Sequence, residues 1–128
     1  MGVILDTNAV SAAVDKDDAL LSLVRLHGRP YLPIHVIGEY QFGLLGSRLR
    51  KSIEPFFVQL KSQSIILAAD LETAKEYATL RHELKLRGRP IPENDLWIAS
   101  LARQHGLPIA SRDERHFDGL EGVTRLGW

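Results

Sequence analysis

The sequence predicts an α/β fold in which helices cover both faces of a parallel sheet. Short apolar runs alternate with longer helical stretches along the whole chain, which is the signature of βαβ crossovers. The chain has 128 residues, a length typical of one domain, and we expect residues 1–128 to form a single domain. Its hydrophobic fraction of 45% and charged fraction of 25% are ordinary for a globular protein.

Composition excludes several classes of function. The chain has no cysteine, which rules out disulfides, thiol catalysis and thiolate metal sites. No apolar run reaches the roughly 18 residues that span a membrane, and no basic segment followed by an apolar stretch marks a leader peptide. We therefore expect a cytoplasmic protein with no membrane association. The 16 basic and 16 acidic residues cancel, so net charge gives no argument for a nucleic-acid partner.

The first part of the chain reads as strand, helix, helix and strand. An apolar run predicts a buried strand over residues 3–5, directly followed by a short helix over 7–14. A second helix is expected over residues 19–27, with Asp17 or Asp18 as its N-cap and Gly28 at its end. Tyr31 and Leu32 form a brief second strand that Pro33 stops.

The middle of the chain is mainly helical. Residues 34–46 predict a helix that is apolar almost all round, so Glu39 on this helix indicates a cleft or a partner. Residues 47–63 predict a further helix, with a break or fresh start near Ser52 because Pro55 lacks an amide hydrogen. A third strand is expected over residues 64–67.

The last part predicts a long helix, a second helix, and two more strands. Asp70 caps a helix over residues 71–87, which Gly88 ends. Arg81 falls within its predicted apolar side and is expected to reach the surface or to pair with a buried acid. A helix over 93–105, a strand over 107–110, a helical turn over 114–117 and a strand over 123–126 follow. The core side of the long helix is predicted to comprise Leu71, Ala74, Tyr77, Ala78 and Leu84.

Four acids stand where a site could form. Asp6 and Asp113 each come just after a predicted strand, and ligands bind outside the carboxyl ends of parallel strands. Glu39 and Asp95 lie on helices. On a helical wheel Asp95 falls with Ile98, Ala99 and Ala102 on the core side, whereas Glu93 falls with Ser100 and Gln104 on the solvent side. Taken one at a time, Asp6, Asp95 and Asp113 could equally be helix caps, and Glu39 a solvated acid.

Taken together, the acids predict a divalent-cation site. Carboxylates that converge repel one another unless a cation lies between them. Mg²⁺ or Mn²⁺ suits an all-oxygen site, with Asp6, Asp95 and Asp113 as ligands and Glu39 bound directly or through water. Such a metal activates water and neutralises charge during phosphodiester hydrolysis. The five histidines lack the i, i+4 spacing of a zinc site. Supporting roles fall to Thr7 and Ser111, which could orient the water, and to Asn8, which could hold Asp6.

These motifs resemble the PIN-domain nucleases, in particular the VapC-like ribonuclease toxins of toxin–antitoxin pairs. The matching pieces are residues 5–8 with Asp6, residues 36–40 with Glu39, residues 92–99 with Asp95, and Ser111 to Asp113 with Phe117 beyond. The resemblance covers essentially the whole chain. It implies a three-layer α/β/α sandwich around a short parallel sheet of four to five strands.

The resemblance also implies an activity and partners. It implies Mg²⁺- or Mn²⁺-dependent endoribonuclease cleavage of RNA, with Asp6, Glu39, Asp95 and Asp113 as the catalytic acids. It implies a cognate VapB-like antitoxin and a homodimer. One departure is that many relatives carry a further acid just before the last-motif Phe, where this chain has His116.

Two other functions compete with the nuclease. The first is an aspartyl-phosphate phosphatase or phospho-acceptor that uses Asp6 as its nucleophile. It is disfavoured because Asn8 stands where the phosphatase needs a second Asp. The second is a catalytically silent module that binds RNA or a protein, which the balanced charge and the apolar helix over 34–46 permit.

Overall fold

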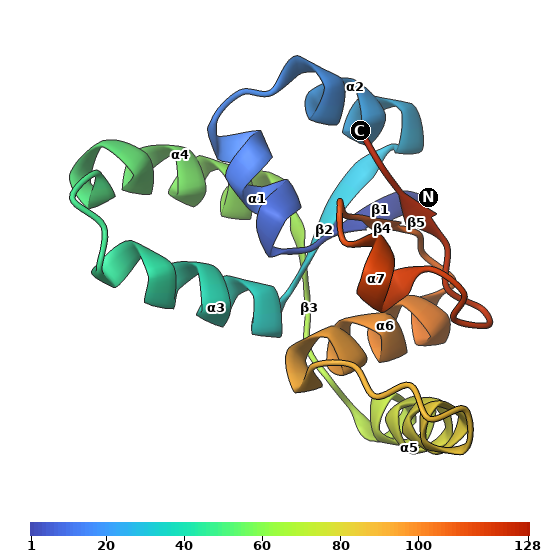
Figure 1. Ribbon diagram of the computed structural model, residues 1–128. Coiled ribbons are helices and arrows are strands. Elements are labelled where there is room, and N and C mark those ends of the chain that lie inside the picture. The colour runs from blue at the N-terminus through green and yellow to red at the C-terminus, as the bar shows by residue number, and fades with distance from the viewer.

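A computed structural model describes residues 1–128 and contains the predicted parallel sheet (Figure 1). Its five strands lie in the order β3-β2-β1-β4-β5, and every neighbouring pair is parallel. The elements run β1 (Gly2–Leu5), α1 (Thr7–Val14), α2 (Asp18–His27), β2 (Arg29–Pro33), α3 (Ile34–Leu45), α4 (Arg50–Gln63), β3 (Ile65–Leu67), α5 (Leu71–Leu86), α6 (Glu93–His105), β4 (Ile109–Ala110), α7 (Glu114–Phe117) and β5 (Arg125–Leu126).

The layers follow from the strand order. The chain moves outward from β1 to β2 and β3, then crosses back to β4, so right-handed crossovers place helices on both faces. In Figure 1, α1 and α2 lie on one side of the sheet and α5 and α6 on the other, with α7 beside α6. The three-layer α/β/α prediction is confirmed. No helix of the structure combines the length and the apolar character needed to cross a bilayer.

The central strand explains where the core sits. Val3, Ile4 and Leu5 are fully buried, as an apolar strand covered on both faces should be. β4 pairs with β1 in the register Ile4↔Ile109 and Leu5↔Ala110. Because the register continues past both strands, Asp6 and Ser111 leave the sheet side by side at its carboxyl edge.

Most helix boundaries follow the predicted caps. Helix α1 spans the predicted residues, and Asp17 caps α2 by accepting a hydrogen bond of 3.1 Å from the Leu20 amide. Gly106 ends α6 in a left-handed conformation, with φ of 64°. The helix predicted over residues 47–63, with a break or fresh start near Ser52, begins at Arg50 as α4. It continues through Pro55 without a break, at the cost of one intrahelical hydrogen bond.

The predicted core side of α5 is wrong for three of its five residues. The buried residues are Thr73, Leu80 and Leu84, whereas Leu71 is 90% exposed. The helix is rotated because Thr73 joins both the cap at Asp70 and a hydrogen bond with Gln104 of α6. Of the predicted core residues, Ala74 and Ala78 are exposed, Tyr77 is half-buried and Leu84 is buried. Arg81 stays at the surface, where it donates a 2.7 Å hydrogen bond to the Tyr77 hydroxyl.

One residue of α6 also differs from the helical wheel. Ser100, predicted on the solvent side, is fully buried. Its hydroxyl donates to the Leu96 carbonyl at 2.6 Å, so the helix itself satisfies the polar atom.

Candidate functional site

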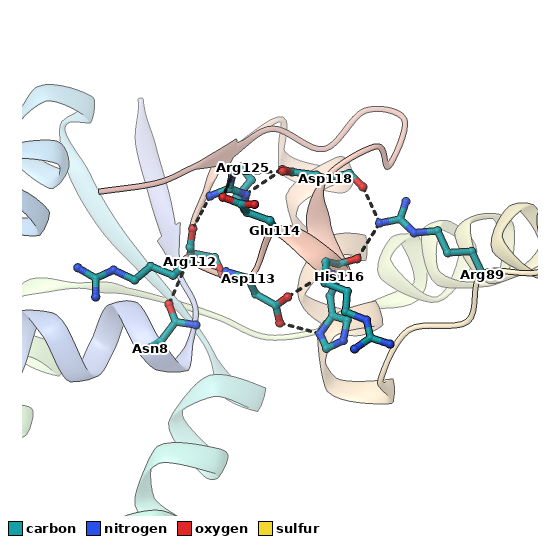
Figure 2. A network of polar contacts seen from close by, with 10 residues as sticks. Asn8, Arg89, Arg112, Asp113, Glu114, His116, Asp118 and Arg125 are labelled. Atoms are coloured by element: carbon teal, nitrogen blue, oxygen red, sulfur yellow. Dashed lines mark hydrogen bonds and ion pairs between the residues drawn. The ribbon is translucent and has the colours of Figure 1, made fainter.

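The site lies where the direction of chain winding reverses. Connections from β1 run toward β2 and β3, whereas β4 lies on the other side of β1 and connects to β5. Loops that leave such neighbouring strands diverge and open a crevice at the carboxyl edge of the sheet. Asp6 follows β1 and Asp113 follows β4, so both acids flank this crevice. The loops are joined by a 3.1 Å hydrogen bond from the Arg112 amide to the Asn8 side chain (Figure 2).

Asp6 is the most buried of the four acids, with 5% of its surface exposed. It caps α1 by accepting a 3.0 Å hydrogen bond from the Ala9 amide, and Asn8 donates to its other oxygen at 3.3 Å. Burial is the main cause that raises the pKa of Asp6 to about 6, and the charges of Asp95 and Asp113 raise it further. The Ser111 hydroxyl and the Ala9 amide act against this rise. Asp6 is therefore both a helix cap and a carboxylate whose charged form is disfavoured by burial.

Asp95 enters the crevice from the first turn of α6. Burial raises its pKa, the contact with His116 lowers it, and the charges of Asp113 and Glu39 raise it again. Residues Ile98, Ala99 and Ala102 on the same side of the helix are buried, as the wheel predicts. Pro92, at the N-cap position, makes no side-chain cap. The Asp95 side chain is turned toward the crevice and away from the usual capping role.

Asp113 and His116 complete the inner cluster (Figure 2). One Asp113 oxygen caps the short helix α7 by accepting a 3.0 Å hydrogen bond from the His116 amide. The His116 Nδ1 atom lies 2.6 Å from the other Asp113 oxygen and 2.7 Å from an Asp95 oxygen. One donor atom from each of Asp95, Asp113 and His116 lies within 4.8 Å of the others. Ser111 supports the loop by accepting a 2.9 Å hydrogen bond from the Asp113 amide.

Glu39 lies at the outer side of the same site. It is exposed on α3, and it accepts a 3.2 Å hydrogen bond from the Asn94 side chain of α6. Its charge contributes to the raised pKa of Asp95, which places the two carboxylates near each other. The structure therefore brings Glu39 to the rim of the crevice but outside the inner cluster. Thr7, the remaining predicted residue, is half-buried at the start of α1, beside Asp6.

No lysine or arginine forms an ion pair with any of the four acids. The neighbouring Arg125 is held instead by Asp118 at 2.8 Å and by the Ser111 carbonyl at 3.0 Å. Buried carboxylates must be paired, protonated or bound to a metal. Asp95, Asp113 and His116, with the Asp6 carboxylate close enough to interact with the charges of both acids, are a donor set that fits a divalent cation.

A basic hollow adjoins the acids. It has a volume of about 340 Å³ and is lined by Gly88, Arg89, Pro90, Ile91, Arg115 and His116. A second hollow of about 450 Å³ continues from the shared residues Gly88, Pro90 and Ile91 toward Arg81 and Lys85. Arg89 shapes the first hollow, because its guanidinium donates to the carbonyls of Arg115 and Asp118 at 2.8 and 2.6 Å (Figure 2). The crevice thus has an acidic centre and a basic flank.

The comparisons with known proteins agree with this architecture. The model of the PIN domain matches residues 3–122. The fold, a parallel sheet with acids at its carboxyl edge, is consistent with this match. The chain belongs to the PIN-domain family.

Similar proteins include a ribonuclease and a toxin. The chain is 29% identical to VapC ribonuclease Y4jK of Sinorhizobium fredii, covering 95% of this chain and 96% of the relative. It is 30% identical to toxin FitB of Neisseria gonorrhoeae, covering 98% of each chain.

Two solved structures share the fold. VapBC2 from Rickettsia felis, bound to a DNA fragment from its promoter, superposes with a TM-score of 0.88 at 24% identity, covering 100% of this chain and 99% of that one. VapBC-5 of Mycobacterium tuberculosis, a member of the VapBC family of toxin–antitoxin systems, superposes with a TM-score of 0.77 at 25% identity, covering 98% of each chain.

Sequence reasoning noted His116 only as a departure from the acid that many relatives carry there, without predicting its contacts with Asp95 and Asp113, and it missed Asn94. The search for histidine pairs at i, i+4 spacing could not find His116, because its partners are carboxylates. The available signal was its position three residues after Asp113, which places both side chains on one side of a helical turn. Asn94 stands next to Asp95 in the sequence, yet only the approach of α3 to α6 brings it to Glu39.

Proposed function

We propose that this PIN-domain protein is a divalent-metal-dependent endoribonuclease and the toxin of a VapBC-type toxin–antitoxin pair. The observation that carries the proposal is the convergence of four acids with no lysine or arginine paired to them, at the carboxyl edge of the sheet. The names of the relatives, a VapC ribonuclease and the toxin FitB, support the choice of reaction and biological role. Such a toxin acts in the cytoplasm, where its substrate is found.

Asp6, Asp95 and Asp113 would hold Mg²⁺ or Mn²⁺, with Glu39 bound directly or through a water molecule. When bound, the metal supplies an activated water and neutralises charge that develops on the phosphate. Thr7 and Ser111 would position the water, while Asn8 fixes the Asp6 carboxylate through its 3.3 Å hydrogen bond. The chain's own contribution is to orient the acids and hold them close together.

The basic hollow would receive the RNA backbone beside the scissile phosphate. Arg115 lines this hollow without an acidic partner. Lys85 extends the positive charge along the neighbouring hollow, where Arg81 is paired with Glu93 at 3.8 Å. Phosphate contacts of this kind position a nucleic acid without reading its sequence. The positive flank therefore accounts for binding of RNA by a chain whose net charge is zero.

The partners follow from the same assignment. We propose a VapB-like antitoxin, in keeping with the toxin–antitoxin character of VapBC-5, and a homodimer as the resting state of the free protein. Exposed apolar residues on α3 and in the loop before α4 suit such contacts: Phe42 is 79%, Leu45 66% and Leu49 63% exposed. Large apolar side chains exposed to this extent suit a protein-binding face.

The proposal is tested by cleavage of total cellular RNA with purified protein. The wild-type chain should cleave RNA in Mg²⁺ or Mn²⁺ and lose activity in chelator, and Asp6→Asn should be inactive in either metal. Far-ultraviolet circular dichroism controls for folding of the variant. Cleavage that survives both chelation and Asp6→Asn would remove the proposed mechanism, and RNA binding without any cleavage would favour the silent-module alternative.

A further inference from the structure

His116 has a place in the crevice that a capping or packing role does not explain. Its Nδ1 atom is buried, has no aligned hydrogen-bond partner, and still lies within 2.7 Å of one oxygen of Asp95 and 2.6 Å of one oxygen of Asp113. A ring nitrogen carries one proton or one lone pair, so it can satisfy at most one of these two oxygens in a directed hydrogen bond. The nitrogen is therefore directed between the two carboxylates.

The backbone holds the ring in this position. The His116 amide donates to the second Asp113 oxygen at 3.0 Å, and the next residue, Phe117, is fully buried in the core. The imidazole is thus attached to a short helix that is fixed on one side by Asp113 and on the other by the core. Little conformational freedom remains to be lost when the nitrogen binds a ligand.

The spacing of the three atoms is that of neighbouring ligands on one ion. In an octahedral site with ligands at the distance usual for Mg²⁺, adjacent ligand atoms lie about 3 Å apart. The contacts from Nδ1 to the two oxygens, 2.7 and 2.6 Å, come within a few tenths of an ångström of that edge. A small opening of the cluster would admit an ion between one nitrogen and two oxygens.

We propose that His116 Nδ1 is a direct ligand of the catalytic metal, so that this site is a mixed nitrogen–oxygen site that selects Mn²⁺ over Mg²⁺. The inference rests on the proposed function, because it concerns the metal of that same site. Mg²⁺ is a hard cation that keeps oxygen ligands and water, whereas first-row transition ions accept imidazole. A site built only from carboxylates lacks this reason to discriminate between the two ions.

The direct test is pulsed electron paramagnetic resonance of Mn²⁺ bound to the untagged protein, with and without isotopically labelled histidine. A coordinated imidazole produces a nitrogen modulation that changes with the isotope. We expect the modulation in the wild-type chain and in His82→Gln, a control at an exposed histidine of α5. We expect it to be absent in His116→Asp, which supplies oxygen ligands at the same place.

Calorimetric titration gives a second readout that does not depend on activity. The ratio of the Mg²⁺ to the Mn²⁺ dissociation constant should fall by about tenfold in His116→Asp and stay unchanged in His82→Gln. If His116→Asp does not fold, His116→Gln replaces it, and the isotope effect in the wild-type chain is sufficient for the decision.

The outcomes separate this inference from the one on which it rests. Saturable Mn²⁺ binding without histidine nitrogen modulation in the wild-type chain overturns His116 as a ligand, reduces it to a residue that positions the carboxylates, and leaves the proposed nuclease intact. No saturable binding of Mn²⁺ or Mg²⁺ overturns both proposals.

Discussion

The two ends of helix α6 lie beside groups of acids whose charges are balanced in different ways. Near its C-terminus, Arg103 pairs with Glu83 at 2.9 Å and with Glu76 at 3.4 Å, and 15% of the arginine side chain is exposed. At its N-terminus, Asp95 and Asp113 are 20% and 27% exposed and contact only His116. The charges of the first group are balanced by an arginine of the chain, whereas the second group has no lysine or arginine partner.

This contrast distinguishes the acids that are paired with Arg103 from the acids that are proposed to bind the metal. Removing a charge from the Arg103 group should destabilise the fold and leave the reaction unchanged, because it leaves partly buried carboxylates without a partner. Removing a charge from the Asp95 group should stop the reaction. It should also stabilise the metal-free protein, because it relieves charge repulsion and the cost of burying a charge. The following predictions test this opposition, from the largest expected effect to the smallest.

The largest effect is expected for Asp95→Asn. Loss of this carboxylate should reduce RNA cleavage by about 100-fold or more, since even residues that only support a metal ligand cost 10- to 100-fold. Glu72→Gln is the control, because Glu72 is an exposed acid of α5 that lines neither hollow. Initial rates of cleavage of one fluorescent RNA measure both variants. Equal loss in the two variants would contradict the distinction.

The stability of the metal-free protein should fall as the pH rises through the pKa of Asp6. That pKa is raised from 3.8 to about 6 by folding, so the folded state binds more protons than the unfolded state between these values. A shift of this size lowers the free energy of unfolding by about 3 kcal/mol once the pH is above the pKa of the folded state. Below the pKa of the unfolded state it has no effect. Asp95 shifts in the same direction.

Urea unfolding in chelator at mildly acidic and at mildly alkaline pH measures this loss. Asp6→Asn should remove most of the pH dependence, since an amide does not titrate. A wild-type protein that instead gained stability across the same interval would show that the Asp6 carboxylate is balanced within the fold.

Arg103→Met should destabilise the fold by about 2 kcal/mol, below the usual range for a fully buried pair because its partners are partly exposed. Glu76 and Glu83 would be left at the α5–α6 contact without a cation. Chemical denaturation measures the change, and cleavage by the folded fraction should be unaltered. A loss of RNA cleavage as large as that of Asp95→Asn would instead place Arg103 in the active site.

The smallest effect is expected at the basic hollow. Arg115→Gln should weaken RNA binding severalfold and reduce its salt dependence by about one released counterion. The measurement uses the inactive Asp95→Asn background, with fluorescence anisotropy at several salt concentrations. An exposed control is Arg48→Gln, which lies in the loop before α4 and does not line either hollow.

The sequence predicted the order of the elements and the place of the acids better than it predicted side-chain faces. Strands and caps are encoded locally, so Asp17, Asp70 and Gly106 could be assigned from neighbouring residues. The parallel sheet then brought Asp6 and Asp113 to one edge, because strand ends meet there whatever the details of packing.

The predictions of side-chain burial were wrong where a buried residue is polar. Thr73 and Ser100 are polar residues that are buried because one meets Gln104 and the other its own helix, and hydrophobic periodicity assigns such residues to solvent. The contacts of His116 were not predicted, since its partners come from α6 and from the loop after β4. Contacts between elements of this kind cannot be read from the spacing of one residue type.

Metal-linked thermal stability tests most directly whether the crevice depends on a divalent ion. A ligand that binds only the folded state stabilises it by about 2.7 kcal/mol at 100 times its dissociation constant. The melting temperature of the wild-type chain and of Arg103→Met should therefore rise with Mn²⁺ or Mg²⁺ and saturate, and that of Asp95→Asn should stay flat. A wild-type melting temperature that does not respond to either ion, or an equal rise in Asp95→Asn, would contradict the assignment of these acids to a metal site.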